Sequence, residues 1–363
     1  MDWGFFQELL SIDSTSGKER KVAEWLAERL PGMFPAANRP ELRAEEVGDG
    51  TLNLLLTWGS PRIVFCSHLD TVPPYIPPTF PERWPVAAGH DENTAVIPGL
   101  TGNLPETIKG RGSCDAKGQV FAIVEACKRL AEEGKTDFGM LLLAGEETGS
   151  WGAKAFAKTA FRAEYLVVGE PTDNCMVSAS KGTKSFDLKF TGEPFHSGYP
   201  KYGVSAVDLF VEFVNALKAK DFGMDPVLGE TTWNIGLLHS DNPQNILSPE
   251  LTCRLYFRTT FVSDEAVCQW MDEASSVIPG LTGNLAVTAR GGDTPARYWT
   301  VEGLPSKSVA FGSDAPHLKN FSHKAICGPG SITVAHRDDE HVLVADLATA
   351  VEQYLALYRS VTE

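Results

Sequence analysis

Acids and histidines follow several short apolar segments of this chain. The segments IVFCSHLD, MLLLAGEE, YLVVGEP and KAICGPGSITVAH supply His68, Asp70, Glu146, Glu147, Glu170 and His336. A fifth segment, GRGSCDAKG, places Asp115 just before a predicted helix. Carboxylate and imidazole groups are the ligands that hold divalent ions such as zinc. The set therefore indicates a metal-dependent hydrolase that binds two divalent ions.

The surrounding pattern indicates how these side chains are positioned. A strand that is buried on both faces reads as a continuous apolar run, and ligands of open α/β sheets bind beyond the carboxyl ends of such strands. Apolar spacing predicts helices over 3–10, 18–30, 117–134 and 151–158, and strands over 51–58 and 62–66. This alternation predicts an α/β fold with a mainly parallel central sheet. The proline-rich stretch 73–109 is excluded from regular helix and from a central strand.

The pattern changes after residue 174. LKFTG, TTWNIGLLH, ELTCRLYFRTT and NLAVTAR read as strands, with helices predicted over 204–217 and 264–276. We expect an inserted α+β domain of ferredoxin-like type over 176–289, which would act as a lid and dimerisation domain. The catalytic domain is then discontinuous, over 1–175 and 290–363, and ends in a helix over 345–359.

Composition limits the classes of partner. The formal net charge of −15 argues against nucleic acid, whose binding requires Lys and Arg to neutralise phosphates. No apolar run approaches the roughly 18 residues of a membrane span, and the first residues resemble neither a signal nor a transit peptide. Seven cysteines without a CxxC pair fit reduced thiols. We expect a cytoplasmic protein that acts on a small molecule.

The motifs resemble one known family. SHLDTVP, GRGSCDAKG, AGEETGSWGA, VVGEPT and a late AH with an acid four residues on are similar, in this order, to the signatures of the co-catalytic di-zinc deacylases and exopeptidases. This family includes acetylornithine deacetylase, succinyl-diaminopimelate desuccinylase, aminoacylase and glutamate carboxypeptidase. The resemblance extends over nearly the whole chain.

The resemblance implies a role for each motif residue. Asp115 bridges two zinc ions and precedes a cis peptide bond to Ala116, and Glu146 is the general base. Asp70 orients a ligand histidine by accepting its second imidazole proton, which its position two residues on allows. Cobalt can replace zinc. The remaining ligands are His68 and Glu170 at the first zinc, and Glu147 and His336 at the second.

The predicted insert carries further matches. His196 in FHSGYP resembles a lid histidine that reaches the active site of a partner subunit, although Phe195 stands where the family has glycine. Asn245 and Arg258 resemble residues that contact the substrate carboxylate, a task that suits the two-pronged guanidinium. Tyr256 replaces the acid that usually stands two residues before that arginine. In the last part of the chain, Ser313 and Asp314 resemble a loop that lines the substrate pocket. The resemblance implies a homodimer.

Three activities and two inactive alternatives are weighed at this point. The nearest match is an acetylornithine deacetylase-like deacylation of an N-acyl amino acid with a free carboxylate, which would belong to arginine biosynthesis. Succinyl-diaminopimelate desuccinylase-like activity and dipeptidase or carboxypeptidase activity share the same motifs. A non-catalytic binding homologue would be expected to lack the base or a ligand, whereas Glu146 and the ligand set are present. A purely structural dimer module would leave the clustered acids unexplained.

Overall fold

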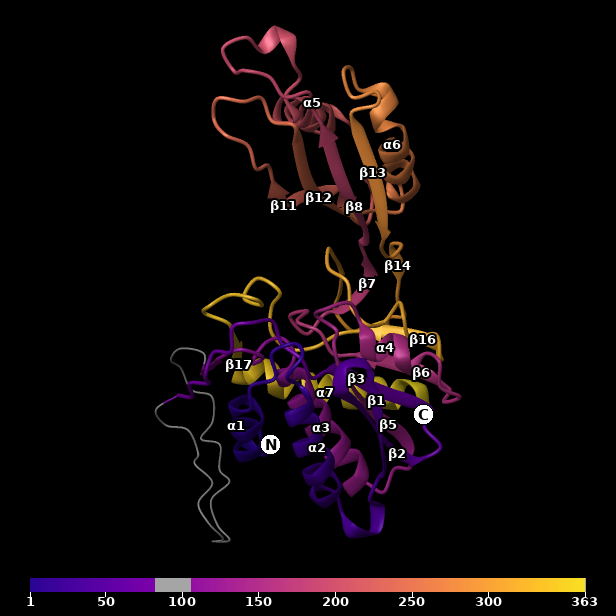
Figure 1. Cartoon of the computed structure of the whole chain (residues 1–363). Coiled ribbons are helices and arrows are strands. Elements are labelled where there is room, and N and C mark those ends of the chain that lie inside the picture. Colours follow the sequence, from indigo (N-terminus) through magenta and orange to yellow (C-terminus); the bar gives the residue numbers. More distant parts are fainter. Residues whose placement is uncertain (82–105, 363) are drawn as a thin grey trace. The chain divides into compact units, whose positions relative to one another are not determined.

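The computed structural model describes residues 1–81 and 106–362, and the chain forms two compact units (Figure 1). The first contains residues 1–178, 298–307 and 313–363, and the second contains residues 179–297 and 308–312. The second unit extends past the predicted insert end at 289, because that position lies inside strand β13 (Leu285–Gly291). Each unit has a hydrophobic core of its own.

The first unit is built on a six-stranded sheet in the order β1-β2-β5-β3-β6-β16. The strands are β1 (Glu41–Val47), β2 (Thr51–Gly59), β3 (Ile63–His68), β5 (Asp137–Leu143), β6 (Ala163–Val168) and β16 (Phe321–Ile326). β3 pairs in parallel with both β5 and β6, and β6 pairs in parallel with β16. β1 and β5 both pair antiparallel with β2. The expected mainly parallel α/β sheet is confirmed.

Apolar side chains on both faces of this sheet are buried. In β3, Ile63 and Phe65 join the core that the main helices of the unit help to form, and the alternate residues Val64 and Cys66 are buried as well. α3 packs on β3 and β5 and also contacts α1 and α7, whereas α4 contacts β1 and β2. The helices are α1 (Trp3–Ser11), α2 (Arg20–Arg29), α3 (Lys117–Glu132), α4 (Trp151–Phe156) and α7 (Val344–Thr362), with short 3-10 turns η1 (Leu30–Met33), η2 (Ala36–Asn38) and η3 (Gly48–Gly50).

Strand β1 was not predicted from the sequence. Its sequence ELRAEEV is mostly charged, and most of its side chains are exposed. It lies at the edge of the sheet and pairs only with β2, where charged side chains are tolerated and discourage pairing with another chain.

Short strands make up three smaller sheets. β4 (Thr107–Lys109) pairs with β17 (His341–Leu343), and β9 (Met224–Asp225) pairs with β10 (Gly229–Glu230). β7 (Met176–Ser180) lies between β14 (Ala296–Arg297) and β15 (Ser306–Val309). β4 belongs to the proline-rich stretch, of which 82–105 lies outside the described residues. Within the described ranges, every helix is too short or too polar to cross a membrane.

The second unit is a four-stranded antiparallel sheet with two helices. Its strands lie in the order β11-β12-β8-β13, and the chain order β8-α5-β11-β12-α6-β13 is that of a ferredoxin-like fold. Side chains of β12 alternate between the core with the helices and the opposite face, where Arg254 pairs with Asp187 at 2.7 Å. The remaining elements are β8 (Gly182–Thr191), η4 (Pro200–Tyr202), α5 (Ala206–Ala219), β11 (Thr232–His239), β12 (Glu250–Thr259) and α6 (Asp264–Val277).

Candidate metal centre

His68 is the last residue of β3 and is only 1% exposed. Its Nδ1 lies 2.9 Å from the main-chain oxygen of Asp70 and 3.5 Å from the carboxylate Oδ1 of the same residue. The closer partner of the ring is therefore the Asp70 carbonyl group, rather than the carboxylate that the sequence suggested. With Nδ1 directed to a carbonyl oxygen, Nε2 is the ring atom that can bind a metal.

The carboxylate of Asp70 holds the loop that carries the two adjacent glutamates. Its Oδ1 accepts the backbone N–H of Glu146 at 2.9 Å, and its Oδ2 accepts the N–H of Glu147 at 3.2 Å. The hydroxyl of Ser16 donates to Oδ2 at 3.0 Å. Burial would raise the pKa of Asp70, but hydrogen bonding to His68 and to these donors lowers it. Asp70 is therefore an anion that connects the end of β3 to the loop after β5.

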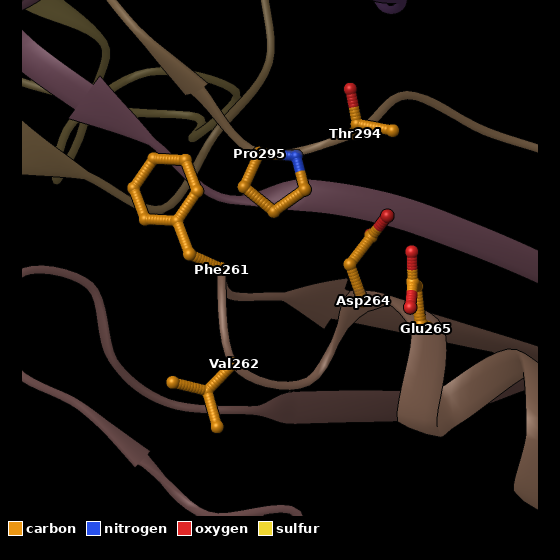
Figure 2. A pocket seen from close by; sticks show the side chains of 6 residues that line it. All are labelled: Phe261, Val262, Asp264, Glu265, Thr294 and Pro295. Carbon is orange, nitrogen blue, oxygen red and sulfur yellow. The ribbon is translucent and has the colours of Figure 1, made fainter.

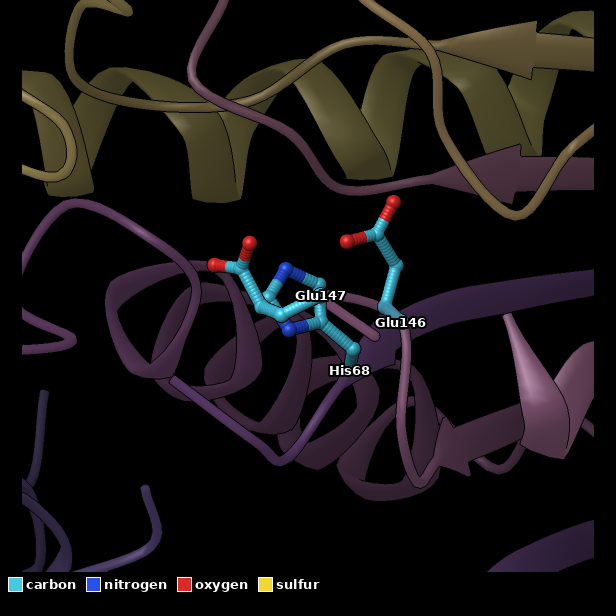
Figure 3. A group of neighbouring side chains, drawn as sticks. All are labelled: His68, Glu146 and Glu147. Atoms are coloured by element: carbon cyan, nitrogen blue, oxygen red, sulfur yellow. The ribbon is translucent and has the colours of Figure 1, made fainter. Parts of the chain in front are cut away.

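Glu146 and Glu147 follow β5 through Gly145, whose φ of 66° lies in the left-handed region that favours glycine. In the view of Figure 3, their carboxyl groups lie on either side of the His68 ring. Burial raises the pKa of Glu146, and the negative charges of Asp314 and Glu147 add to this effect while His68 opposes it. One oxygen of each carboxyl group lies within 4.8 Å of the other. Two negative charges at this distance favour a bound cation.

Asp115 lies between two imidazole rings. Its Oδ1 is 3.1 Å from Nε2 of His68, and its Oδ2 is 3.2 Å from Nε2 of His336. The peptide bond from Asp115 to Ala116 is cis, as the family resemblance implies. Hydrogen bonds to Asp115 and Glu147 raise the pKa of His336 to about 10. The carboxylate of Asp115 can therefore contribute one oxygen atom to each of two neighbouring sites.

His336 does not stand at the end of a strand, contrary to the sequence prediction. β16 ends at Ile326, and His336 follows in a stretch of turns with a φ of 62°. The apolar letters ITVA were mistaken for the end of a strand. The turn nevertheless brings Nε2 of His336 within 3.0 Å of Oε1 of Glu147.

Glu170 completes the set of ligands. It follows β6 and is buried, and its Oε1 has no hydrogen-bond partner within 1–81 and 106–362. Burial raises the pKa of Glu170, and the negative charge of Glu146 raises it further. A buried carboxylate oxygen without a partner is costly unless a cation or a donor reaches it. This atom is evidence that a metal fits the site.

The ligand atoms form two groups that share Asp115. Atoms of His68, Asp115 and Glu170 lie within 4.8 Å of one another, and so do those of Asp115, Glu147 and His336. A third group, His68 with Glu146 and Glu147, would use His68 twice, although only its Nε2 is available. When the two groups that share Asp115 are taken as the metal sites, Glu146 is not used as a ligand and remains free for proton transfer.

Two further acids lie at this centre. The family resemblance assigned Asp314 to a loop that lines the substrate pocket and assigned no role to Glu340. Asp314 is buried, and its pKa is raised to about 6, mainly by burial and against the opposing effect of His68. Glu340, the acid four residues after His336, binds the loop that carries Asp115. Its place in the late AH motif was the available signal. Ser313, predicted to line the substrate pocket, is buried beside Asp314, and its Oγ accepts the N–H of Ala315 at 3.3 Å.

The second unit places the remaining predicted residues in two groups. The loop of His196 pairs with that of Asn245, because the N–H of Ser197 donates to the Asn245 carbonyl at 2.9 Å. Both loops come before β12 in the chain, and this strand begins at Glu250. Arg258 lies near the other end of the strand. At about 3.3 Å per residue, the length of the strand between Glu250 and Arg258 is about 26 Å.

The two departures from the family pattern have local explanations. Phe195 has no left-handed backbone conformation that would call for glycine. The guanidinium of Arg258 lies over the ring of Tyr256, 5.0 Å from its centroid, where the family has an acid. A cation–π contact therefore holds this arginine in place of an ion pair.

A pocket of about 260 Å³ in the second unit contains none of the predicted site residues (Figure 2). Its acid Asp264 is already engaged by Lys184 at 2.7 Å and by the hydroxyl of Thr259. The pocket therefore does not compete with the metal centre as a site of chemistry. Its lining residues are Phe261, Val262, Asp264, Glu265, Thr294 and Pro295.

Known peptidases resemble this chain over nearly its whole length. A probable carboxypeptidase of Aspergillus terreus is 30% identical over 97% of this chain and 84% of its own length. A probable carboxypeptidase of Emericella nidulans is 31% identical over 98% of this chain and 88% of its own length. A tripeptidase from Staphylococcus aureus shares the fold, with a TM-score of 0.77 at 19% identity over 97% of this chain and 95% of that chain.

An M20 family metallo-carboxypeptidase from Sulfolobus solfataricus also shares the fold, with a TM-score of 0.69 at 16% identity over 99% of this chain and 100% of that chain. A model of the peptidase family M20/M25/M40 matches residues 64–360, which include every proposed metal ligand. The chain therefore belongs to the peptidase family M20/M25/M40, and it is a hydrolase that acts on amide bonds.

Proposed function

We propose that this chain is a two-metal exopeptidase of carboxypeptidase type, which hydrolyses the amide bond next to a free carboxylate. The observation that carries the proposal is the pair of ligand groups that share Asp115 while leaving Glu146 unused. The names of the fungal relatives favour a peptide substrate over acetylornithine. Zinc suits the mixed imidazole and carboxylate donor set, and cobalt would be expected to replace it.

The reaction would follow from the position of Glu146. Two divalent ions, when bound, would lower the pKa of water and polarise the scissile carbonyl. Glu146 would accept the proton that water loses as its oxygen bonds to the carbonyl carbon. When the carbon–nitrogen bond breaks, Glu146 would return that proton to the leaving nitrogen. The burial and negative neighbours that raise its pKa support a group able to both accept and release a proton.

Arg258, Asn245 and His196 would bind the substrate. Asn245 lies in the loop before β12 and Arg258 near the far end of that strand, so the two side chains of one copy would be too far apart to hold one carboxylate. This separation supports an arrangement in which His196 and Asn245 serve the site of a partner copy. We therefore propose that His196 stabilises the oxyanion in trans.

A homodimer through the second unit would allow such an exchange. β11 is an edge strand of the second unit, and Leu237 and Leu238 on it are 71% and 56% exposed. Pairing with a second copy would cover these side chains and satisfy the free edge of the strand. All seven cysteines are unpaired, which supports the further proposal that the protein works in the reducing cytoplasm.

A second candidate is deacylation of an N-acyl amino acid of the acetylornithine or succinyl-diaminopimelate type. The same water addition cleaves both kinds of amide, and the motifs GRGSCDAKG and GEPT favour this alternative. Release of free amine should be measured for dipeptides, N-acetyl amino acids and N-succinyl amino acids after metal analysis. Carboxyamide versions of each substrate serve as matched controls.

Faster cleavage of dipeptides than of N-acyl amino acids would support the carboxypeptidase proposal. The opposite order would support deacylation. Absence of cleavage in every class, from protein that holds two metals, would contradict both proposals and favour a binding homologue.

A further inference from the structure

Glu340 is a buried acid with four donors from a single segment. Its Oε1 accepts the backbone N–H groups of Gly112, Cys114 and Asp115 at 2.9, 3.0 and 3.1 Å. Its Oε2 accepts from the guanidinium of Arg111 at 2.6 Å. The Glu340 side chain is fully buried, with 0% exposure, and that of Arg111 is 1% exposed. Every one of these donors lies in the segment that ends at Asp115.

These contacts satisfy backbone N–H groups that have no hydrogen-bond partner in a helix. Gly112, Cys114 and Asp115 precede α3, so their N–H groups have no place in its hydrogen-bond ladder. A carboxylate that accepts three N–H groups and one guanidinium group fixes the direction of each donor. A buried ion pair is weak evidence for stability, because an apolar replacement often packs equally well. The number of contacts therefore indicates a role in geometry.

The same contacts join the loops of two metal ligands. Glu340 follows His336 by four residues and lies directly before β17. Arg111 also donates to the main-chain oxygen of Arg337, at 3.2 Å, beside His336. The Gly110 N–H donates to the Glu340 carbonyl at 3.0 Å. The loop of Asp115 and the turn of His336 are thus connected at Glu340 and Arg111.

Both of these ligands belong to the group completed by Glu147. We propose that Glu340 is a positioning residue that fixes Asp115 relative to His336, and so sets the metal affinity of the Asp115–Glu147–His336 site. The inference rests on the proposed two-metal function. The other site shares Asp115 but should depend on Glu340 less, because its other two ligands are held by the central sheet: His68 ends β3 and Glu170 follows β6.

The test is a titration of metal-free protein with zinc, in which calorimetry measures the affinity of each binding event. His336→Ala identifies which of the two binding events belongs to the Asp115–Glu147–His336 site, called the second site below. Glu340→Gln keeps the size of the side chain but removes its charge and one of its two acceptor oxygens. We expect its affinity for the second metal to fall about 10- to 100-fold, the usual effect of losing a partner that orients a ligand. Affinity for the first metal should change much less.

Two control variants and one spectroscopic measurement separate positioning from general loss of stability. Asp264→Asn breaks a largely buried ion pair in the second unit and should leave both affinities unchanged. The visible absorption spectrum of cobalt-loaded protein should change in Glu340→Gln, because it reports the coordination geometry of the bound ion. Arg111→Lys keeps the positive charge, so its second-site affinity should remain closer to that of the parent protein.

If Glu340→Gln does not fold, Glu340→Asp decides the question. The aspartate keeps its charge but draws the carboxylate back from the three N–H groups, so the affinity for the second metal should still fall. Unchanged affinity in a folded variant, or equal loss at both sites, would overturn the proposal. A parent protein that binds fewer than two metals would instead contradict the proposed function, which is a distinguishable result.

Discussion

The backbone N–H of Glu146 donates to Oδ1 of Asp70 at 2.9 Å. The acid beside the His68 ring therefore also fixes the loop of the proposed base. Asp70→Asn would retain one acceptor oxygen for the N–H groups of Glu146 and Glu147 and turn the other position into a donor. We expect both metal affinity and kcat to fall about 10- to 100-fold, measured by zinc titration and steady-state kinetics.

Ser16→Ala is the matched control for this change. It removes only one donor to Asp70 and leaves both N–H contacts in place. Its effect should be the smaller of the two. An equal effect of both substitutions would show that the hydroxyl contact, rather than the N–H contacts, determines the position of Asp70.

Substitution of the two adjacent glutamates separates the base from a ligand. Glu146→Gln should retain both metals and lose about 10²- to 10⁴-fold in kcat, since only proton transfer is removed. Glu147→Gln should instead lose the second metal, since its carboxylate faces His336 at 3.0 Å. Metal content after dialysis and turnover number decide between the two. Near-normal turnover in Glu146→Gln would show that the base is misassigned.

Removal of metal should lower stability as well as activity. Without metal, the carboxylate of Asp115 lies close to that of Glu170 in one ligand group and to that of Glu147 in the other. Chelation should therefore abolish turnover and lower the melting temperature. Zinc at a hundred times its dissociation constant should restore about 2.7 kcal/mol per site at 25 °C. Scanning calorimetry at increasing zinc checks this, and cobalt should restore turnover. A melting temperature independent of zinc would contradict metal binding.

Mixing two inactive variants tests whether His196 acts across the dimer. His196→Ala and Glu146→Ala should each be inactive alone. In a heterodimer with exchange in trans, one site has both residues intact and the other has neither. Activity should therefore recover after subunit exchange. No recovery in a demonstrated heterodimer would place His196 in its own subunit or outside the reaction.

Arg258 should determine preference for a free carboxylate. Arg258→Gln should raise KM about 10- to 100-fold for peptides with a free carboxylate, because a hydrogen bond to a charged group contributes about 1.5 to 3 kcal/mol. Peptides with a carboxyamide end should be affected little. Arg254→Gln, on the same face of β12, is the control. An equal rise in KM for both kinds of peptide would contradict the assignment.

The site residues at strand ends could be predicted because one local signal marks them. His68 ends a buried strand, and Glu146 and Glu170 each follow one. The apolar runs of these strands are visible in the sequence, and the sheet brings their ends together. The predicted position of His336 at a strand end was wrong, because its turn resembles a strand only in its amino-acid sequence. No contact could be predicted for Glu340, because three of its four donors are backbone N–H groups, which have no sequence signature.

The pairing of strands sets a further limit on what the sequence can predict. Four of the seven residues of β1 are charged, so no continuous apolar run marks it, and its pairing with β2 makes it a strand. Likewise, the distance between Asn245 and Arg258 depends on β12 extending between them without a break. Motif matching places both residues near one substrate but does not say which copy supplies each.

The contact of Arg258 with Tyr256 also has a kinetic consequence. An acid in place of Tyr256 would hold the guanidinium but cancel its field, whereas the ring holds it and leaves its charge uncancelled by that neighbour. In a chain with a net charge of −15, a local positive potential would raise the rate at which anionic substrates arrive. Added salt should therefore lower kcat/KM for carboxylate substrates more than for their neutral carboxyamides.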